Sequence, residues 1–359
     1  MDILSFQSSD KKMTGGHRPY NIDKALESLG DKVTRVVNWR DWGIDRKLVK
    51  RLTPTQINNR LKLKKFLDLQ IKNKIILFHG IQNEKLLGKF SNYRFPIVLD
   101  YRDDPILQAE MNGIPINVDK AKKLIEYNFK SSDIILFPSK TLMDYYSEYK
   151  EKAIVVMNAS DPSHFKYSKN PLNDKAICLY PPMPCFFYPD VLDASTLVRN
   201  HIKNFEISIM NLQAKYRKFY GDFDKTIHVK YEHPWISSFN SMPYSEIGKF
   251  ISQFTIGIIA YKKFTYANLG TPLKLFDLMA CGRPIVAMRC KEIEKIVSDA
   301  NCGLLCDFTK EDLAEKMINL LENSDLIIKM GENGRRAVEK KHSWIHRAKV
   351  IQDEILKLT

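Results

Sequence analysis

Residues 255–288, TIGIIAYKKFTYANLGTPLKLFDLMACGRPIVAM, indicate the fold class of this chain. The stretch begins with an unbroken apolar run at 256–260 and ends with a second one at 284–288. Between the two runs, a turn-rich segment at 268–272 precedes an apolar pattern with helical spacing, which Gly282 ends. Buried parallel strands typically read as unbroken apolar runs, so the stretch predicts a strand–helix–strand unit of a parallel sheet.

The start of the expected helix carries the first functional signal. Thr271 is a preferred N-cap residue and Pro272 suits the first helical position. A helix that begins just after a parallel strand directs its unpaired N–H groups and its positive dipole end into the crevice above the sheet, where a phosphate can bind. The positive charge of Lys274 in the first turn is unfavourable at the positive dipole end, and a bound anion would account for it. Asp277 could accept hydrogen bonds from hydroxyl groups of the same ligand. An ordinary crossover with a solvated lysine and aspartate is the alternative reading.

Length and composition limit the class of protein. The chain has 359 residues, 44% of them hydrophobic and 27% charged, which suits two soluble domains of ordinary size. We expect no transmembrane helix, because no apolar run reaches about 18 residues, and no secretory signal at the amino terminus. The six cysteines lack paired spacing, which favours reduced thiols over a zinc or disulfide framework. These features predict a cytoplasmic protein.

The chain is strongly basic, with a formal net charge of +14. Much of the excess lies at 46–74, where ten Lys and Arg residues stand against Asp68 alone, a local net charge of +9. Residues 53–74 also carry an apolar helical stripe, so they are either a solvated basic helix or a peripheral patch on an anionic membrane surface. Binding of nucleic acid is less favoured, because Phe66 is the single aromatic residue among the basic ones and no nucleic-acid fold signature appears.

Two further segments place polar residues after expected strands in the first half of the chain. Gly15 and Gly16 follow a strand at 3–6, and adjacent glycines let a backbone approach a ligand closely. Residues 100–105, DYRDDP, follow a strand at 97–99, and the carboxyl ends of parallel strands are where such folds bind ligands. Aspartates that only cap a strand end and the next helix are the alternative.

Residues 270–287, GTPLKLFDLMACGRPIVA, closely resemble the segment P-L-K-L-F-E-Y-M-A-x-G-x-P-V-V-A of family 4 retaining glycosyltransferases, which have the GT-B fold. Residues 158–165 resemble that family's N-G-V-D-x-x-x-F, and 243–247 its P-Y-x-E-L. The resemblance implies an α/β protein with two Rossmann-like domains facing across a cleft. Residues 1–168 would form the acceptor domain and 172–340 the donor domain, joined by a linker at 166–175. The helix at 341–359 would pack back on the first domain.

The resemblance also implies site residues. The diphosphate of a nucleotide-sugar donor would be bound by Gly270, Thr271, Pro272, Leu273 and Lys274, and its ribose by Asp277, where the family usually has Glu. Gly15 and Gly16 would face the donor phosphates and the acceptor. Arg102 and Asp103 stand at the family's D-x-H-D segment and would act near the donor sugar, with Lys262 supplying a further cation.

Two departures from the family pattern bear on activity. Leu269 stands where the family has the first of two carboxylates, and residues 181–190 lack the usual Lys-Gly. The resemblance as a whole still implies a metal-independent hexosyltransferase without a cofactor, active in glycan biosynthesis. It would use a UDP- or GDP-sugar and a polysaccharide, lipid-linked or other glycan acceptor. The alternative is a catalytically inactive subunit of the same fold that binds nucleotide-sugar or glycan.

Overall fold

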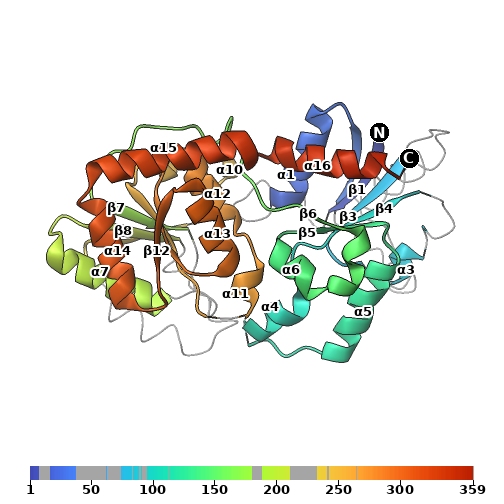
Figure 1. Ribbon diagram of the computed structural model, residues 1–359, viewed down its shortest axis with the longest axis horizontal. Helices are drawn as coiled ribbons and strands as arrows, with labels where there is room; N and C mark the ends of the chain where they lie inside the picture. The colour runs from blue at the N-terminus through green and yellow to red at the C-terminus, as the bar shows by residue number, and fades with distance from the viewer. Residues whose placement is uncertain are drawn as a thin grey trace, which may run out of the picture. The chain divides into compact units, whose positions relative to one another are not determined.

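The computed structural model describes residues 1–7, 17–37, 62, 74–82, 84–88, 90, 95–111, 113–179, 188–210, 233–240, 242–263 and 265–358. These residues form two compact units, each with a six-stranded sheet whose strands are all parallel (Figure 1). Unit 1 comprises Met1–Ala109, Pro115–Met157 and Trp344–Thr359, and unit 2 comprises Glu110–Ile114 and Asn158–Ser343. The predicted α/β class with two Rossmann-like parts is confirmed.

The sheet of unit 1 has the strand order β2-β1-β3-β4-β5-β6. Its strands are β1 (Asp2–Gln7), β2 (Lys32–Val37), β3 (Lys74–His79), β4 (Ile97–Asp100), β5 (Ile134–Phe137) and β6 (Ala153–Val155). Every residue of β3, β4 and β5 is buried, as expected for strands covered on both faces. Because the strands are parallel, their carboxyl ends lie at the same edge of the sheet, and the polar residues His79 and Asp100 are the last residues of β3 and β4 there.

Helices connect and cover the strands of unit 1. They are α1 (His17–Ser28), α3 (Glu84–Leu87), α4 (Pro105–Met111), α5 (Val118–Lys130), α6 (Lys140–Tyr145), the 3₁₀ helix η2 (Ser147–Lys152) and α16 (Trp344–Leu356). The last helix of the chain, α16, packs against α1. Its buried residues include Trp344 and Ile351, so an apolar face holds it on this unit.

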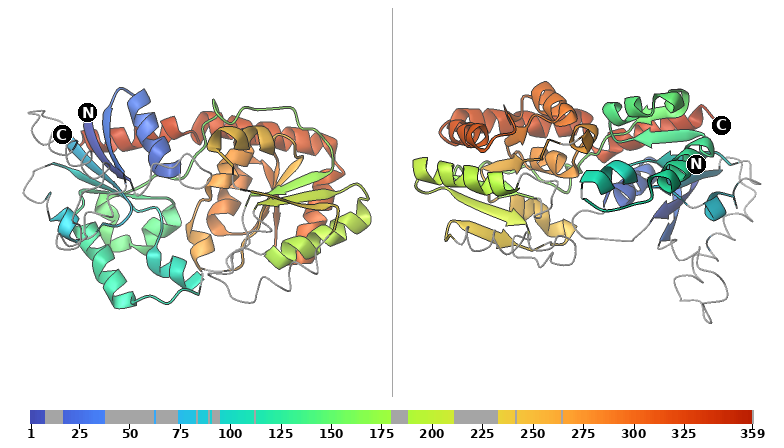
Figure 2. Two further views of the ribbon diagram at one scale, coloured as in Figure 1. Left: turned by 180° about the vertical axis from the view of Figure 1, so that it is seen from behind. Right: turned by 90° about the horizontal axis from the view of Figure 1, so that it is seen from below.

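The sheet of unit 2 has the order β12-β11-β10-β7-β8-β9. Its strands are β7 (Lys175–Cys178), β8 (Glu206–Met210), β9 (Ile236–Phe239), β10 (Ile256–Ile259), β11 (Ile285–Met288) and β12 (Gly303–Cys306). Its helices are α7 (Tyr188–His201), α10 (Tyr244–Ile251), α11 (Thr265–Leu269), α12 (Leu273–Ala280), α13 (Lys291–Ala300), α14 (Lys310–Leu321) and α15 (Ser324–Lys341). In each unit, the strands lie among the helices of that same unit (Figure 2).

The strand–helix–strand unit expected at 255–288 is present as β10, α12 and β11, with Gly257 paired to Ile285 in parallel register. Gly257 permits the close packing of this unit, because a Cβ added there would lie 2.5 Å from Leu278 Cδ1 of α12. Gly282 ends α12 with a φ of +71°, the left-handed conformation that favours glycine. The predicted stop is therefore confirmed.

The remaining sequence expectations concern the membrane, the thiols and the basic stretch. None of the helices in the described part of the chain is both long and apolar enough to span a membrane. Five cysteines in that part are buried and lie outside any disulfide. Of residues 53–74, only Lys62 and Lys74 are described. The predicted basic helix thus lies outside the described residues.

Candidate functional site

The candidate site of unit 2 lies where the strand order reverses. From the neighbouring central strands β7 and β10, one connection leads through α7 to β8 and the other through α12 to β11. Such a reversal opens a crevice at the carboxyl ends of the two strands, and ligands of open α/β sheets bind there. The residues that follow β10, from Tyr261 to the start of α12, therefore occupy the position from which a ligand is bound in this fold class.

The loop after β10 is more regular than the sequence indicated. Residues 268–272 were expected to be a turn, but Asn268 and Leu269 belong to the short helix α11. Burial explains the difference, because Ala267 and Leu269 are 5% and 4% exposed and the helical turn places both in the core. Asn268 Oδ1 accepts a hydrogen bond from the Lys291 N–H, 2.9 Å away, and so ties α11 to α13.

Helix α12 begins one residue later than predicted. Its N-cap is Pro272, which is extended at φ −67° and ψ 134° and makes no side-chain cap hydrogen bond, and Leu273 is the first helical residue. The expectation that Thr271 caps the helix is wrong, because its Oγ1 accepts from the Asn158 N–H at 3.3 Å and its carbonyl oxygen accepts from Asn158 Nδ2 at 2.6 Å. A start without a side-chain cap suits an anionic ligand in place of the cap.

Asp277 lies behind this helix start and is 6% exposed. Its Oδ1 accepts a hydrogen bond from Ser160 Oγ at 2.7 Å. Burial raises the pKa of Asp277 to about 7, although the Ser160 hydrogen bond and the charge of Lys274 act in the opposite direction. The carboxyl group therefore changes its protonation state close to neutral pH, as groups at functional sites often do.

The segment around Ser160 supports α12, a role that the sequence reasoning missed. Besides the contact with Asp277, the Ser160 N–H donates to the His342 carbonyl oxygen at 3.0 Å. Asn158 holds Thr271 from the same segment. The sequence indicated residues 158–161, N-A-S-D, only through the family resemblance of 158–165, because nothing in their local pattern indicates a contact with a helix more than 110 residues away.

Packing does not require a glycine at position 270. A Cβ added there would meet no atom within 4 Å, and its φ is not in the left-handed region. One loop and one helix of unit 2 hold six of the predicted site residues, namely Gly270, Thr271, Pro272, Leu273, Lys274 and Asp277. Gly15 and Gly16 lie outside the described residues.

Lys262 lies three residues after the end of β10 and acts electrostatically on Asp190 at the start of α7. Burial and the neighbouring Asp193 raise the pKa of Asp190, whereas Lys310 and Lys262 counteract the increase. Lys262 is thus near the amino end of α7, which follows β7, and both segments belong to the reversal point of the sheet.

Arg102 and Asp103 belong to unit 1 and follow β4. Their side chains are 29% and 45% exposed, and Arg102 Nε lies 3.5 Å from Asp103 Oδ2. Asp104 has the capping role that the sequence left open, since its Oδ1 accepts from the N–H groups of Ile106 and Leu107 at 2.8 Å each. The two predicted residues remain accessible, while Asp104 is structural.

A buried charged cluster lies directly before Arg102, and the sequence did not indicate it. Asp100 accepts from Arg18 Nη2 at 2.7 Å and faces His79 Nδ1 at 2.9 Å, while His79 Nε2 faces Asp23 at 3.2 Å. Burial raises the pKa of Asp100, but Arg18 and His79 outweigh this and hold it below its usual range. Burial lowers the pKa of His79, but its two carboxylate partners reverse that effect. The cluster joins α1, β3 and β4 and fixes the strand end that carries Arg102.

Comparisons with known sequences point to one class of protein. Residues 212–353 match the family model described as "Glycosyl transferase-like". An uncharacterized glycosyltransferase of Methanocaldococcus jannaschii is 40% identical over 67 residues, which cover 18% of this chain and 19% of the relative. A second one from that organism is 29% identical over 85 residues, covering 23% and 22%. The match therefore spans about a fifth of each relative.

Solved structures match over the whole length of the chain. Sucrose-phosphate synthase from Thermosynechococcus elongatus has a TM-score of 0.72 at 12% identity and covers 100% of this chain and 99% of its own. Anabaena HepE in complex with UDP-glucose has a TM-score of 0.70 at 14% identity, covering 99% and 100%. WaaG, a glycosyltransferase involved in lipopolysaccharide biosynthesis, has a TM-score of 0.64 at 12% identity, covering 98% and 99%. The fold is GT-B.

Proposed function

We propose that this chain is a glycosyltransferase that takes a sugar from a nucleotide-diphosphate sugar and transfers it to a glycan acceptor. The observation that carries the proposal is the start of α12, which has no side-chain cap, follows β10 at the strand reversal, and has Lys274 and Asp277 within its first two turns. The family match and the fold support the same class. A UDP-glucose complex of HepE, which has the same fold, favours a UDP-sugar as the first donor to test.

In the proposed site, the diphosphate binds at the amino end of α12, with Gly270, Thr271, Pro272 and Leu273 forming the approach to it. The helix dipole and the Lys274 ammonium group would neutralise the charge that develops on the leaving diphosphate, and Lys262 would add a second cation. Charge neutralisation by the protein is the physical basis for proposing transfer without a metal. Turnover is then expected to persist in EDTA.

Asp277 is the proposed partner of the ribose hydroxyl groups. Its ionised form has about four acceptor positions and no donor, so it can accept from two hydroxyl groups while it also accepts from Ser160 Oγ. Arg102 and Asp103 are proposed as sugar-contacting residues, and Gly15 and Gly16 as backbone neighbours of the donor and acceptor. Transfer of a hexose with retention of configuration is proposed on the resemblance to family 4.

The test is isothermal titration calorimetry of UDP, GDP and their common sugars against the full-length protein. We expect one nucleotide to bind, and Lys274→Ala to weaken that binding by about tenfold, because a phosphate contact with a cation is lost. Lys249→Ala is the matched control, since Lys249 is an exposed lysine of α10. Absence of binding by every nucleotide, or equal losses in both variants, would refute the donor site.

One observation favours the inactive-subunit alternative. Leu269, at the position of the family's first carboxylate, is 4% exposed in α11 and part of the core. Release of UDP from a bound UDP-sugar in the presence of acceptor discriminates the two functions, because an enzyme turns over and a binding subunit does not. Asp277→Asn should abolish the release if it is catalysed by this site.

A further inference from the structure

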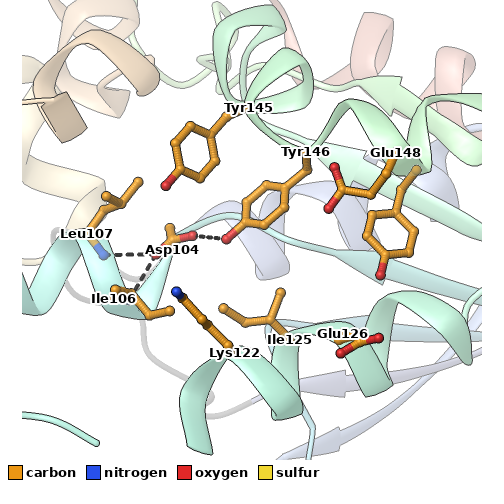
Figure 3. Close-up of a pocket in the computed structure, with 10 residues that line it drawn as sticks. Asp104, Ile106, Leu107, Lys122, Ile125, Glu126, Tyr145, Tyr146 and Glu148 are labelled. Atoms are coloured by element: carbon orange, nitrogen blue, oxygen red, sulfur yellow. Dashed lines mark hydrogen bonds between the residues drawn. The ribbon is translucent and has the colours of Figure 1, made fainter. Parts of the chain in front are cut away.

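Unit 1 contains a pocket that the donor site does not use. Its volume is about 560 Å³, within the range of roughly 300–1,000 Å³ typical of small-molecule sites. It lies between the start of α4, the middle of α5 and the α6–η2 segment (Figure 3). Its lining includes Asp104, Lys122, Ile125, Tyr145, Tyr146 and Glu148.

The Asp104 side of the pocket is held by hydrogen bonds. Asp104 caps α4 and also accepts from the hydroxyl groups of Tyr101 and Tyr146. Burial raises the pKa of Tyr146, and the hydrogen bond to Asp104 raises it further, so its hydroxyl group stays protonated. Tyr101 packs edge-on against Phe129, with ring centroids 4.7 Å apart. The pocket therefore has a preformed polar and aromatic wall.

The open side of the pocket carries polar groups that the described residues leave available. Tyr145 is 53% exposed and packs edge-on against Tyr146 at 5.1 Å. Within the described ranges, the side chains of Tyr145, Lys122 and Glu148 take part in no hydrogen bond or ion pair. The Lys122 ammonium group points toward the Asp104 and Tyr146 side chains, and Glu148 lies beside Tyr146 (Figure 3).

We propose that this pocket binds uncharged sugar units of the acceptor glycan, an inference that rests on the proposed glycosyl transfer. A pyranose ring presents a C–H face and a rim of hydroxyl groups. Tyrosine rings are rigid, amphipathic partners for such a face, and Ile125 extends the apolar surface. The Lys122 ammonium group can donate to sugar hydroxyl groups and the Glu148 carboxylate can accept from them.

Charge decides which glycans fit. The pocket is lined by the carboxylates Asp104, Glu126 and Glu148 and by the single ammonium group of Lys122. Glu126 is further paired with Lys130, 2.5 Å away on α5. With Glu126 compensated by Lys130, Asp104 and Glu148 still outnumber Lys122, and the remaining negative charge repels phosphate and uronate groups. The pocket therefore selects neutral sugar units, although the chain as a whole is strongly basic.

The test begins with the full-length protein on an array of neutral oligosaccharides built from glucose, galactose, mannose or N-acetylglucosamine, beside phosphorylated and uronate-containing ones. We expect a neutral oligosaccharide to bind and the anionic ones to bind less. Titration with the best neutral oligosaccharide should then show about tenfold weaker binding by Tyr145→Ala, because the sugar loses its contact with an aromatic ring. No neutral binder, or a preference for the anionic oligosaccharides, would overturn the proposal.

Matched variants separate the pocket from general effects. Lys122→Ala should weaken oligosaccharide binding while Lys123→Ala, the next residue of α5 and outside the lining, should not. Equal binding by Tyr145→Ala and the unaltered protein would also overturn the proposal. Nucleotide titration of the same variants distinguishes the two hypotheses. Nucleotide binding without oligosaccharide binding rejects only the pocket, and the reverse result rejects only the donor site.

Discussion

Replacing Asp277 with Asn tests the environment of this carboxyl group without assuming any ligand. Asn keeps the shape of the side chain and can still accept a hydrogen bond from Ser160 Oγ. It removes the ionisation whose pKa burial raises to about 7. The two proteins should therefore differ in how their stability depends on pH.

The sign and size of the difference follow from proton linkage. In the unfolded chain Asp277 loses its proton near its ordinary pKa of 3.8, whereas in the folded protein it keeps the proton until about pH 7. The folded state binds more protons between these values, so the contribution of Asp277 to stability is full below pH 3.8 and is lost as the pH rises through 7. From pH 5 to pH 8 this loss is about 2.6 kcal/mol, at 1.36 kcal/mol per pKa unit.

The assay is thermal unfolding of both proteins at pH 5, 6, 7 and 8, without nucleotide. Asp277→Asn should gain stability relative to the unaltered protein as the pH rises. About 2–4 °C in Tm per kcal/mol is typical of domains of 150–250 residues, so the difference in Tm should grow by roughly 5–10 °C. A difference that stays constant from pH 5 to pH 8 would refute the raised pKa.

A second pair of variants tests whether the hydrogen bond from Ser160 influences the pKa of Asp277. Ser160→Ala removes the hydrogen bond that favours the carboxylate and should move the pH window of Asp277 upward. Ser163→Ala is the control, because Ser163 is exposed and its hydroxyl group donates a hydrogen bond to Asp161 Oδ1 and not to Asp277. A similar window in both serine variants would contradict the assigned role of Ser160.

Three further predictions concern the seating of α12. Gly270→Ala should leave Tm nearly unchanged, because its Cβ meets no atom, but should weaken nucleotide binding measured by calorimetry; unchanged affinity would exclude close ligand approach there. Arg335→Ala should lower the stability of unit 2 by about 2–4 kcal/mol, since Arg335 donates to three backbone carbonyl groups, while the exposed Arg336→Ala stays within about 0.5 kcal/mol in urea unfolding. Gly257→Ala should cost about 1–3 kcal/mol by overpacking, and the double variant with Leu278→Ala should lose less than the sum of the single losses.

Much of the fold could be predicted because its signals are local. The apolar runs around 255–288 are β10 and β11, and Gly282 ends α12 as expected. The exact start of α12 could not be predicted, since Thr271 and Pro272 both suit the first turn. The position of the helix start depended on Asn158, whose backbone N–H donates a hydrogen bond to Thr271 Oγ1.

The candidate site was predicted in part for the same reason. The sequence pattern brought together Gly270 to Lys274 and Asp277, which are neighbours along the chain. It did not bring Asp100 together with Arg18, 82 positions earlier, although both are buried in one ion pair. Titration of Asp277 near neutral pH was equally beyond prediction, because burial depends on packing from other elements.

Local pattern was enough to predict the strand–helix–strand unit, the α/β class and the residues at the amino end of α12, because periodicity, caps and glycines act over a few positions. The surroundings of those residues depend instead on contacts between distant segments. Ser160 reaches Asp277 across 117 positions, and the strand reversal between β7 and β10 places Lys262 near Asp190. Contacts of this kind form only when the whole unit folds, and they set the charge and accessibility from which the chemistry of the site follows.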